Sequence, residues 1–176
     1  MSNSLAVKWG TMHHNRLATA AAIAAVFVTG MTPQSAAHTP ERERFVAIAE
    51  KLEAAPLDPA LTDEREWAVA WLSEAPDITV TLCPAVLAGW DKGNYPYATQ
   101  LLFAYMLSMG AFTIAHTEAA PNAQAEQLAG VEATLNAYRA ILMEHPGARS
   151  PGLEKLLAEK AKGSLSTFVE KARARC

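Results

Sequence analysis

Residues 121–147 read PNAQAEQLAGVEATLNAYRAILMEHPG, and this stretch carries the clearest periodic signal in the chain. Its apolar residues return every three or four positions, which is the spacing of one face of an α-helix. Pro121 and Asn122 are suited to open a helix, and Pro146 with Gly147 is suited to end it. The stretch therefore predicts one long amphipathic helix, whose buried face consists of Leu128, Val131, Leu135, Tyr138 and Leu142.

Two shorter helices are predicted nearer the N-terminus. The first follows Pro40 and ends at Pro56, because apolar residues recur at helical spacing between these two prolines. The second is predicted to start directly after Thr62, a residue type suited to cap a helix, and to stop at Pro76. Their inner faces are predicted to carry Phe45, Ile48, Leu52, Trp67 and Trp71.

The rest of the chain follows the same period, with one exception. Helical segments are predicted at 84–90, 97–115, 151–163 and 165–172. Residues 78–82 alternate apolar and polar like a strand, but no second segment of this kind is there to pair with them, so we expect an extended connector. The chain is therefore predicted to be all-α: a single compact bundle of six or seven helices, in which short connections make most neighbours antiparallel.

The least polar part of the chain is the segment 93–117, which contains no charged side chain when histidine is counted as neutral. A membrane span is the alternative to a buried helix here. Polar residues interrupt the run, whereas a span requires about 18–20 predominantly apolar residues. We therefore expect a buried central helix over 97–115, with an apolar stripe made of Leu101, Leu102, Tyr105, Met109 and Phe112.

The first 37 residues have the pattern of a secretory signal peptide. Lys8 and Arg16 are their only charged side chains, and a mostly apolar, alanine-rich run follows over 17–31. Small residues at Ser35 and Ala37 then surround a plausible cleavage site. The alternative is a membrane anchor, but the run is shorter than the roughly 20 apolar residues that a span requires.

These features divide the chain into two parts. We expect 1–37 to be a signal peptide that is cleaved after Ala37, and 38–176 to be the mature helical domain. The signal would survive if translation began at Met12 instead of Met1. Export would place the domain in the periplasm or outside the cell, with no stable membrane insertion after cleavage.

The charge balance excludes some classes of partner. The chain has 15 basic and 18 acidic side chains and a pI near 5.9. Because two of the basic residues lie in the predicted signal, the mature domain is more acidic still, which gives it no electrostatic reason to bind nucleic acid or anionic lipid. The chain also lacks the phosphate-binding, dinucleotide-binding and calcium-loop patterns, so no cofactor and no metal are expected.

Cys83 and Cys176 are the only two cysteines. An even number of cysteines in an exported chain indicates a disulfide, and we expect these two to be bridged. In the alternative, Cys83 is a small buried apolar residue and Cys176 is a free thiol at a frayed terminus. Neither cysteine has a histidine or a second cysteine close by in sequence, so a catalytic thiol is not expected.

Two histidines are candidates for catalysis. His116 and His145 follow the apolar stripes of the two long helices, with Glu118 and Glu144 close to them in sequence. If these helices pack antiparallel through a short loop, the two histidines lie at opposite ends of the pair, which disfavours a shared metal site. The alternative is that each histidine sits at a helix C-terminus, where a positive charge suits the helix dipole.

The segment from Cys83 to Tyr97 is the predicted binding region. It is the longest stretch of the predicted domain without a clear helical period, and irregular segments held by a rigid scaffold often carry binding groups. Trp90, Tyr95 and Tyr97 are its candidate ligand or partner contacts, because their rings combine an apolar face with a hydrogen-bonding group. In the alternative, these rings only close the end of the bundle.

Five short runs carry a resemblance to a family. They are Glu66–Leu72, Pro76–Val80, Gln127–Glu132, Ala148–Pro151 and Phe168–Ala172. Together they resemble an uncharacterised family of small exported bacterial proteins, over most of the chain from about position 51 onward. The resemblance implies an exported, all-α bacterial domain, and it implies no activity and no site residues.

These observations favour a binding protein over an enzyme. We expect an exported helical module that binds a protein or a small molecule of the cell envelope without catalysis. The absence of a nucleophile–base pair, of paired carboxylates and of metal-ligand spacing motivates this expectation. The alternative is a small envelope hydrolase or lyase that uses His116 or His145 with a nearby carboxylate.

Overall fold

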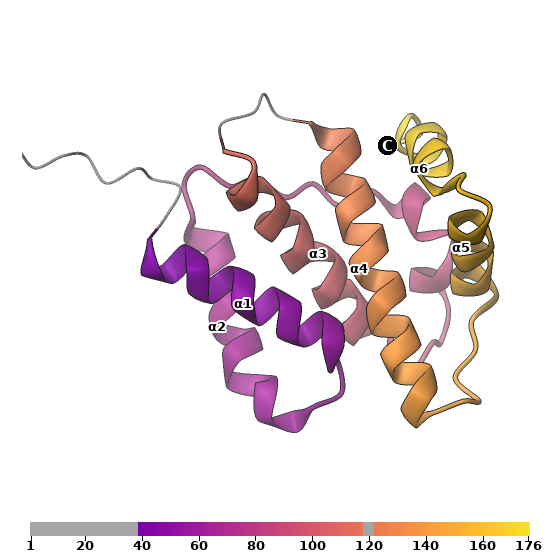
Figure 1. The fold of residues 1–176 in the computed structure, drawn as a ribbon, viewed down its shortest axis with the longest axis horizontal. Coiled ribbons are helices and arrows are strands. Elements are labelled where there is room, and N and C mark those ends of the chain that lie inside the picture. The colour runs from indigo at the N-terminus through magenta and orange to yellow at the C-terminus, as the bar shows by residue number, and fades with distance from the viewer. Residues whose placement is uncertain (1–38, 118–121) are drawn as a thin grey trace, which may run out of the picture. The chain divides into compact units, whose positions relative to one another are not determined.

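The computed structural model describes residues 39–117 and 122–176, which form six α-helices, three short 3₁₀ helices and no β-strand (Figure 1). The predicted all-α class with six or seven helices is confirmed. The predicted signal peptide lies outside the described residues and stays a prediction. The α-helices are α1 (Pro40–Ala54), α2 (Thr62–Glu74), α3 (Ala98–Ala115), α4 (Ala123–Glu144), α5 (Pro151–Ala161) and α6 (Leu165–Arg173), and the 3₁₀ helices are η1 (Pro59–Leu61), η2 (Pro84–Leu87) and η3 (Trp90–Lys92).

The start of α1 follows from its local sequence. The Thr39 side chain accepts a hydrogen bond from the backbone N–H of Arg42, and Pro40 occupies the first helical position. Proline suits that position because it lacks an N–H that the helix would leave unpaired anyway. Glu41 and Glu43 in the first turn place negative charge at the positive end of the helix dipole.

The start of α2 differs from the prediction by one position. Thr62 was expected to cap this helix from outside, but it is the first helical residue, and its hydroxyl donates to the carbonyl of Pro59 at 2.9 Å. The reason is that η1 runs directly into α2, so no extended residue separates them. The cap falls earlier, where the Asp58 side chain accepts from the N–H of Ala60 at 2.9 Å.

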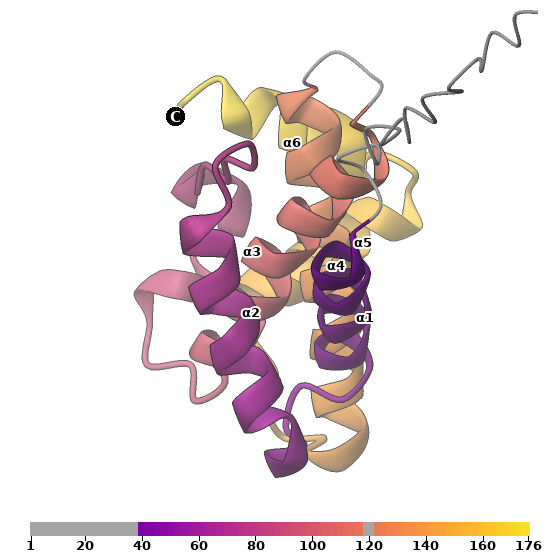
Figure 2. The same cartoon turned by 90° about the vertical axis from the view of Figure 1, so that its left-hand side faces the viewer.

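Helices α3 and α4 run antiparallel side by side through the centre of the described fold (Figure 1). Helices α1 and α2 cover one side of this pair, whereas α5 and α6 lie on the far side of α4 (Figure 2). Gly130 of α4 permits the close approach, because a Cβ there would lie 2.7 Å from the Tyr105 ring and 2.8 Å from Met109 on α3. The antiparallel central pair agrees with the short connection predicted between the two helices.

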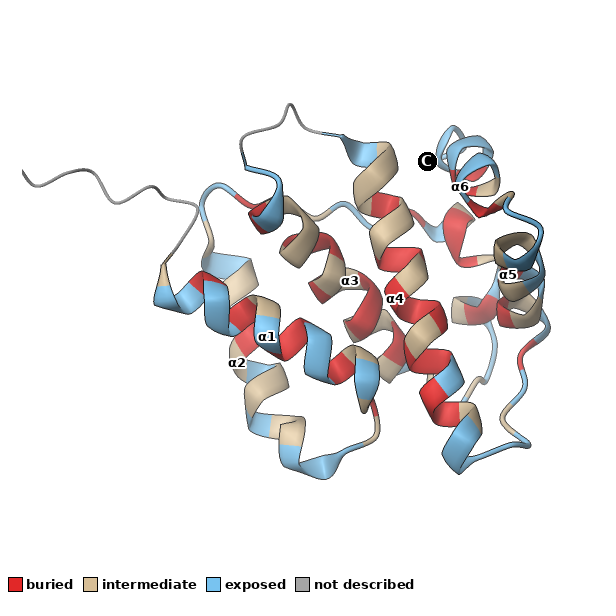
Figure 3. Ribbon diagram, viewed as in Figure 1, coloured by how far each residue is buried: buried red, intermediate tan, exposed pale blue. Residues whose placement is uncertain are grey.

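Buried residues concentrate on α3 and α4 (Figure 3). By length and composition α3 is apolar enough to cross a membrane, yet in this fold it packs against α1, α2 and α4. Helix α2 is peripheral, because Ala68 is its only buried residue. Trp67 and Trp71 of α2 are therefore half-buried, with the Trp71 ring 4.8 Å from that of Phe45 on α1 and the Trp67 ring under the Arg44 guanidinium.

The connection between α2 and α3 is irregular, as predicted for its first part. Residues 78–82 belong to no helix or strand. The single short helix predicted at 84–90 is wrong, because this stretch contains η2 and the start of η3 with a break between them. Ala88 and Gly89 make the break, since both adopt the left-handed conformation, with φ of 50° and 81°. Two successive left-handed residues cannot continue a right-handed helix.

Candidate functional site

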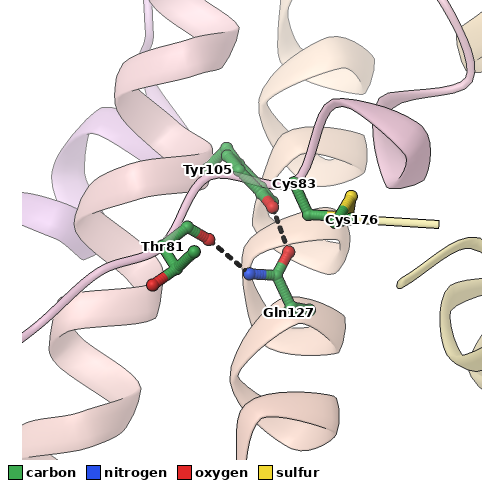
Figure 4. Close-up of a disulfide and its surroundings, with 5 residues drawn as sticks. All are labelled: Thr81, Cys83, Tyr105, Gln127 and Cys176. Carbon is green, nitrogen blue, oxygen red and sulfur yellow. Dashed lines mark hydrogen bonds between the residues drawn. A yellow bond between two sulfur atoms is a disulfide. The ribbon is translucent and has the colours of Figure 1, made fainter. Parts of the chain in front are cut away.

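The two cysteines are joined as predicted. Cys83 and Cys176 form a disulfide with their Cα atoms 5.7 Å apart (Figure 4). Cys83 is 2% exposed and precedes η2, whereas Cys176 is the exposed last residue of the chain. The bridge therefore ties the irregular connection between α2 and α3 to the end of the segment that follows α6.

A buried glutamine holds the same connection from the other side. Gln127 of α4 is 3% exposed, and its Nε2 donates to the carbonyl of Thr81 at 2.6 Å. Its Oε1 accepts from the hydroxyl of Tyr105 on α3, so both ends of the amide are bonded (Figure 4). Sequence reasoning missed this residue. The sequence signal that could have indicated its burial is its position four residues before Val131, on the apolar stripe of the helix.

The hydrogen-bonded cluster of Thr81, Tyr105 and Gln127 is suited to hold the fold together and is not suited to acid–base chemistry. Burial is the main cause that raises the pKa of Tyr105 to about 12, and the Cys83 backbone opposes it to a smaller extent. The phenol therefore stays protonated at neutral pH and serves as a hydrogen-bond donor. Leaving either end of the Gln127 amide unpaired in this interior would cost about 1–3 kcal/mol.

The three predicted contact residues lie at the other end of the connection. Trp90 is 3% exposed and belongs to the main apolar core. Tyr95 and Tyr97 are half-buried, with their rings 5.8 Å apart edge to face. Tyr97 stacks on His145 at 5.3 Å. These contacts are the ones expected of rings that close the end of the bundle, and a ligand-binding role for Tyr95 and Tyr97 stays a prediction.

Hydrogen bonds fix the phenols of this region in place. Tyr95 donates to the carbonyl of Ala148 at 3.1 Å, and burial raises the pKa of Tyr95 to about 12. Tyr138 donates to Glu154 at 2.7 Å and accepts from the N–H of Ser150 at 3.1 Å. The phenols thus hold the chain between α4 and α5 against the core.

Helix α5 docks closely on the break between η2 and η3. A Cβ at Gly152 would lie 2.7 Å from the carbonyl oxygen of Ala88 and 3.2 Å from the backbone nitrogen of Trp90. Because backbone atoms cannot rotate away, only glycine fits this position without a shift of the helix. The predicted binding region is therefore covered by α5 along part of its length.

The two candidate histidines are far from each other. His116 ends α3 and His145 ends α4, and the antiparallel packing of these helices puts them at opposite ends of the pair (Figure 1). His116 is exposed and stacks on Phe112 at 4.0 Å. Glu118, its predicted carboxylate neighbour, lies outside the described residues. In the described part of the chain, no three His, Cys, Asp or Glu side chains gather in a way that could hold a metal ion.

A groove lies between α1 and α4 on the described surface. Its volume is about 360 Å³, which is near the lower end of the range for pockets that hold small ligands. One wall is the last turn and a half of α1, and the other is the C-terminal half of α4. The residues that line it are Glu50, Glu53, Ala54, Asn136, Arg139, Ala140 and Met143.

The groove combines an apolar side chain with charges of both signs. Met143 is 79% exposed, and only Leu82 joins it as an exposed large apolar residue in the described ranges. Glu53 accepts a hydrogen bond from the Asn136 amide across the groove. No described basic group lies within 4.0 Å of the carboxylates of Glu50 and Glu53, and no described carboxylate lies that close to Arg139.

Comparison with protein-family models, with curated proteins and with solved structures gives no match for this chain.

The groove residues had no distinct signal in the sequence. The helical period places Glu50, Glu53 and Arg139 on the polar faces of amphipathic helices. It places Met143 as an apolar residue near a helix end. Glu53 and Asn136 are 83 positions apart, so their contact depends on how α1 crosses α4. The resemblance to small exported bacterial proteins stays a prediction.

Proposed function

We propose that this protein is an exported, non-enzymatic binding module that uses the α1–α4 groove to bind a partner or small molecule of the cell envelope. The observation that supports this proposal is the chemistry of the groove. Its walls carry charges of both signs that have no ion-pair partner among the described residues, and these charges lie beside an exposed methionine. Exposed methionines are frequent at adaptable binding surfaces, because the side chain is flexible and polarizable. The groove lies on packed helices, which suits a preformed site.

Two further observations support export. The first 37 residues have the signal-peptide pattern. The disulfide between Cys83 and Cys176 agrees with an oxidising compartment, because thiols in the bacterial cytosol are kept reduced. Both favour an exported location, in the periplasm or outside the cell.

Processing of the full-length chain tests the export part of the proposal. When the chain is expressed in a bacterium with its own N-terminus, we expect the envelope fraction to contain a protein that begins at His38. N-terminal sequencing and intact mass measure this start. The control is the same chain with Ala37→Pro and Ser35→Pro, which should accumulate unprocessed. A native chain that keeps residues 1–37 in the membrane fraction would contradict cleavage.

Site-specific cross-linking tests the groove. A photoreactive amino acid at position 143 should give an adduct in living cells, and intact mass will show whether the adduct is a protein or a small molecule. The matched control is the same probe at position 82, because Leu82 is the other exposed large apolar residue of the described chain and lies outside the groove.

The charged groove residues give the second comparison. Arg139→Ala in the probe-bearing chain should reduce the adduct strongly while changing the unfolding free energy by no more than about 0.5 kcal/mol, as is usual for exposed sites. Equal adducts from positions 143 and 82, or no adduct from position 143, would contradict binding at the groove.

A further inference from the structure

We infer that the ligand of the α1–α4 groove is a short peptide with free ends, whose terminal ammonium lies against α1 and whose terminal carboxylate lies against Arg139 of α4. The inference rests on the proposed function, because it names the chemical class that the same groove would take. It follows from the placement of charge on the two walls.

The α1 wall is suited to a cation. Glu50 and Glu53 are three residues apart, so they share one face of the helix and both border the groove. Glu53 is half-buried and uses one carboxylate oxygen to accept from Asn136, which leaves its second oxygen available. An ammonium group can donate three hydrogen bonds, and two carboxylates can accept them.

The end of α1 adds to this preference. Helix α1 ends at Ala54 and its C-terminal turn borders the groove, whereas Arg139 lies more than one turn before the end of α4 at Glu144. The last carbonyl groups of a helix carry partial negative charge, which favours a cation nearby. The ammonium end of the ligand is therefore expected beside the last turn of α1.

The α4 wall supplies the opposite charge. Arg139 is exposed, borders the groove, and has no described carboxylate within 4.0 Å. A guanidinium presents paired N–H donors that match the two oxygens of a carboxylate. Arg139 would also repel a ligand that carried only positive charge, so a dipolar ligand fits better than a simple amine. Ala54, Ala140 and Met143 offer apolar surface for the part between the two charges.

The alternative is that the protein satisfies these charges itself. Arg139 is a long side chain on an exposed surface, and it can swing toward Glu50 or Glu53 and close the groove in solution. Exposed ion pairs of this kind are worth at most about 1 kcal/mol. A ligand that brings both charges can therefore displace such a contact, whereas a ligand with one charge leaves part of the wall unpaired.

Four versions of one tripeptide test the inference on the purified, disulfide-bonded protein. Alanyl-leucyl-alanine is titrated with free ends, with an acetylated N-terminus, with an amidated C-terminus, and with both ends blocked. The methyl resonance of Met143, assigned with Met143→Ala, reports binding. We expect the free peptide to bind best and each single block to weaken binding up to about fivefold, which corresponds to the loss of one ion pair at an exposed wall.

Charge-neutral variants assign each end of the peptide to a wall. Glu50→Gln with Glu53→Gln should remove the effect of acetylation, and Arg139→Gln should remove the effect of amidation. The matched controls are Glu170→Gln and Arg173→Gln on exposed positions of α6, which should keep both effects. Binding of the free peptide should also weaken above about pH 8, where a terminal amine loses its proton.

Three outcomes are distinguishable. The selectivity described above, with its loss in the matching variants, supports the inference. Equal binding of all four peptides, or selectivity for the amine alone, overturns the dipolar ligand and leaves the groove as a binding site. No shift of the Met143 methyl with any peptide overturns the inference, and it overturns the proposed function as well if the probe at position 143 gives no adduct in cells.

Discussion

Replacing Cys176 with serine is expected to lower the free energy of unfolding by about 4–5 kcal/mol. The bridge closes a loop with a sequence separation of 93 residues, and in the chain-entropy model a long loop loses much freedom in the unfolded state when it is cross-linked. Because a domain of this kind is stable by about 5–15 kcal/mol, the loss is a large fraction of the total. Urea unfolding followed by circular dichroism measures it.

Cys176 is the better of the two cysteines to replace, because its substitution changes only the bridge. Cys176 is exposed, so Cys176→Ser removes the bond without opening a cavity, whereas Cys83→Ala would also leave a void at a site that is 2% exposed. The control is the wild-type protein with added reductant, which should unfold at the same urea concentration as the variant. A variant as stable as the oxidised wild type, or two free thiols in the unfolded and unreduced wild type, would contradict a stabilising bridge.

Replacing Trp90 with alanine is expected to cost about 3–5 kcal/mol, which is the usual range for removing a large buried aromatic side chain. Trp90 is 3% exposed and packs in the apolar cluster that joins η2 and η3 to α3, α4, α5 and α6. Its loss should leave a cavity where Gly152 brings α5 against the chain. Equilibrium unfolding in urea gives the size of the effect.

Two comparisons separate a structural Trp90 from a ligand-binding one. Leu82→Ala, at a 44% exposed position of the same connection, should change the unfolding free energy by no more than about 0.5 kcal/mol. Trp90→Phe should cost less than Trp90→Ala, because it keeps most of the volume and removes an indole N–H that has no partner in the described structure. If Trp90→Ala were as stable as wild type and only lost binding, the ring would belong to a site.

Most helix positions follow from local sequence, and the reason is visible at α1. Thr39 and Pro40 set its start through a cap and a preset backbone angle, and both effects act within one turn. The apolar stripe of α4 likewise needs only the helical period to be recognised, and Val131, Leu135 and Tyr138 of that stripe are buried. The left-handed conformation of Ala88 was missed because alanine rarely takes a positive φ, and Gly89 was the one residue of the break whose type suits it.

Whether the predicted binding residues are exposed or buried depends on packing between segments that are far apart in the chain. Trp90, Tyr95 and Tyr97 share an irregular segment and so looked like a site, but the position of α5 covers part of that segment through the close approach at Gly152. No prediction was made for Gln127, and its burial on α4 depends on Thr81 and Tyr105, which pair with both ends of its amide.

The sequence by itself determined the all-α class and most of the helix limits, and it predicted the pairing of Cys83 with Cys176, which the structure confirms. Periodicity and caps act over a few residues, and two cysteines allow one intramolecular pairing. Only the tertiary structure decided the groove, because Glu53 and Arg139 come to line it through the crossing of two helices that are far apart in the chain. A crossing angle depends on how many side chains interlock at once, and no single local pattern encodes it.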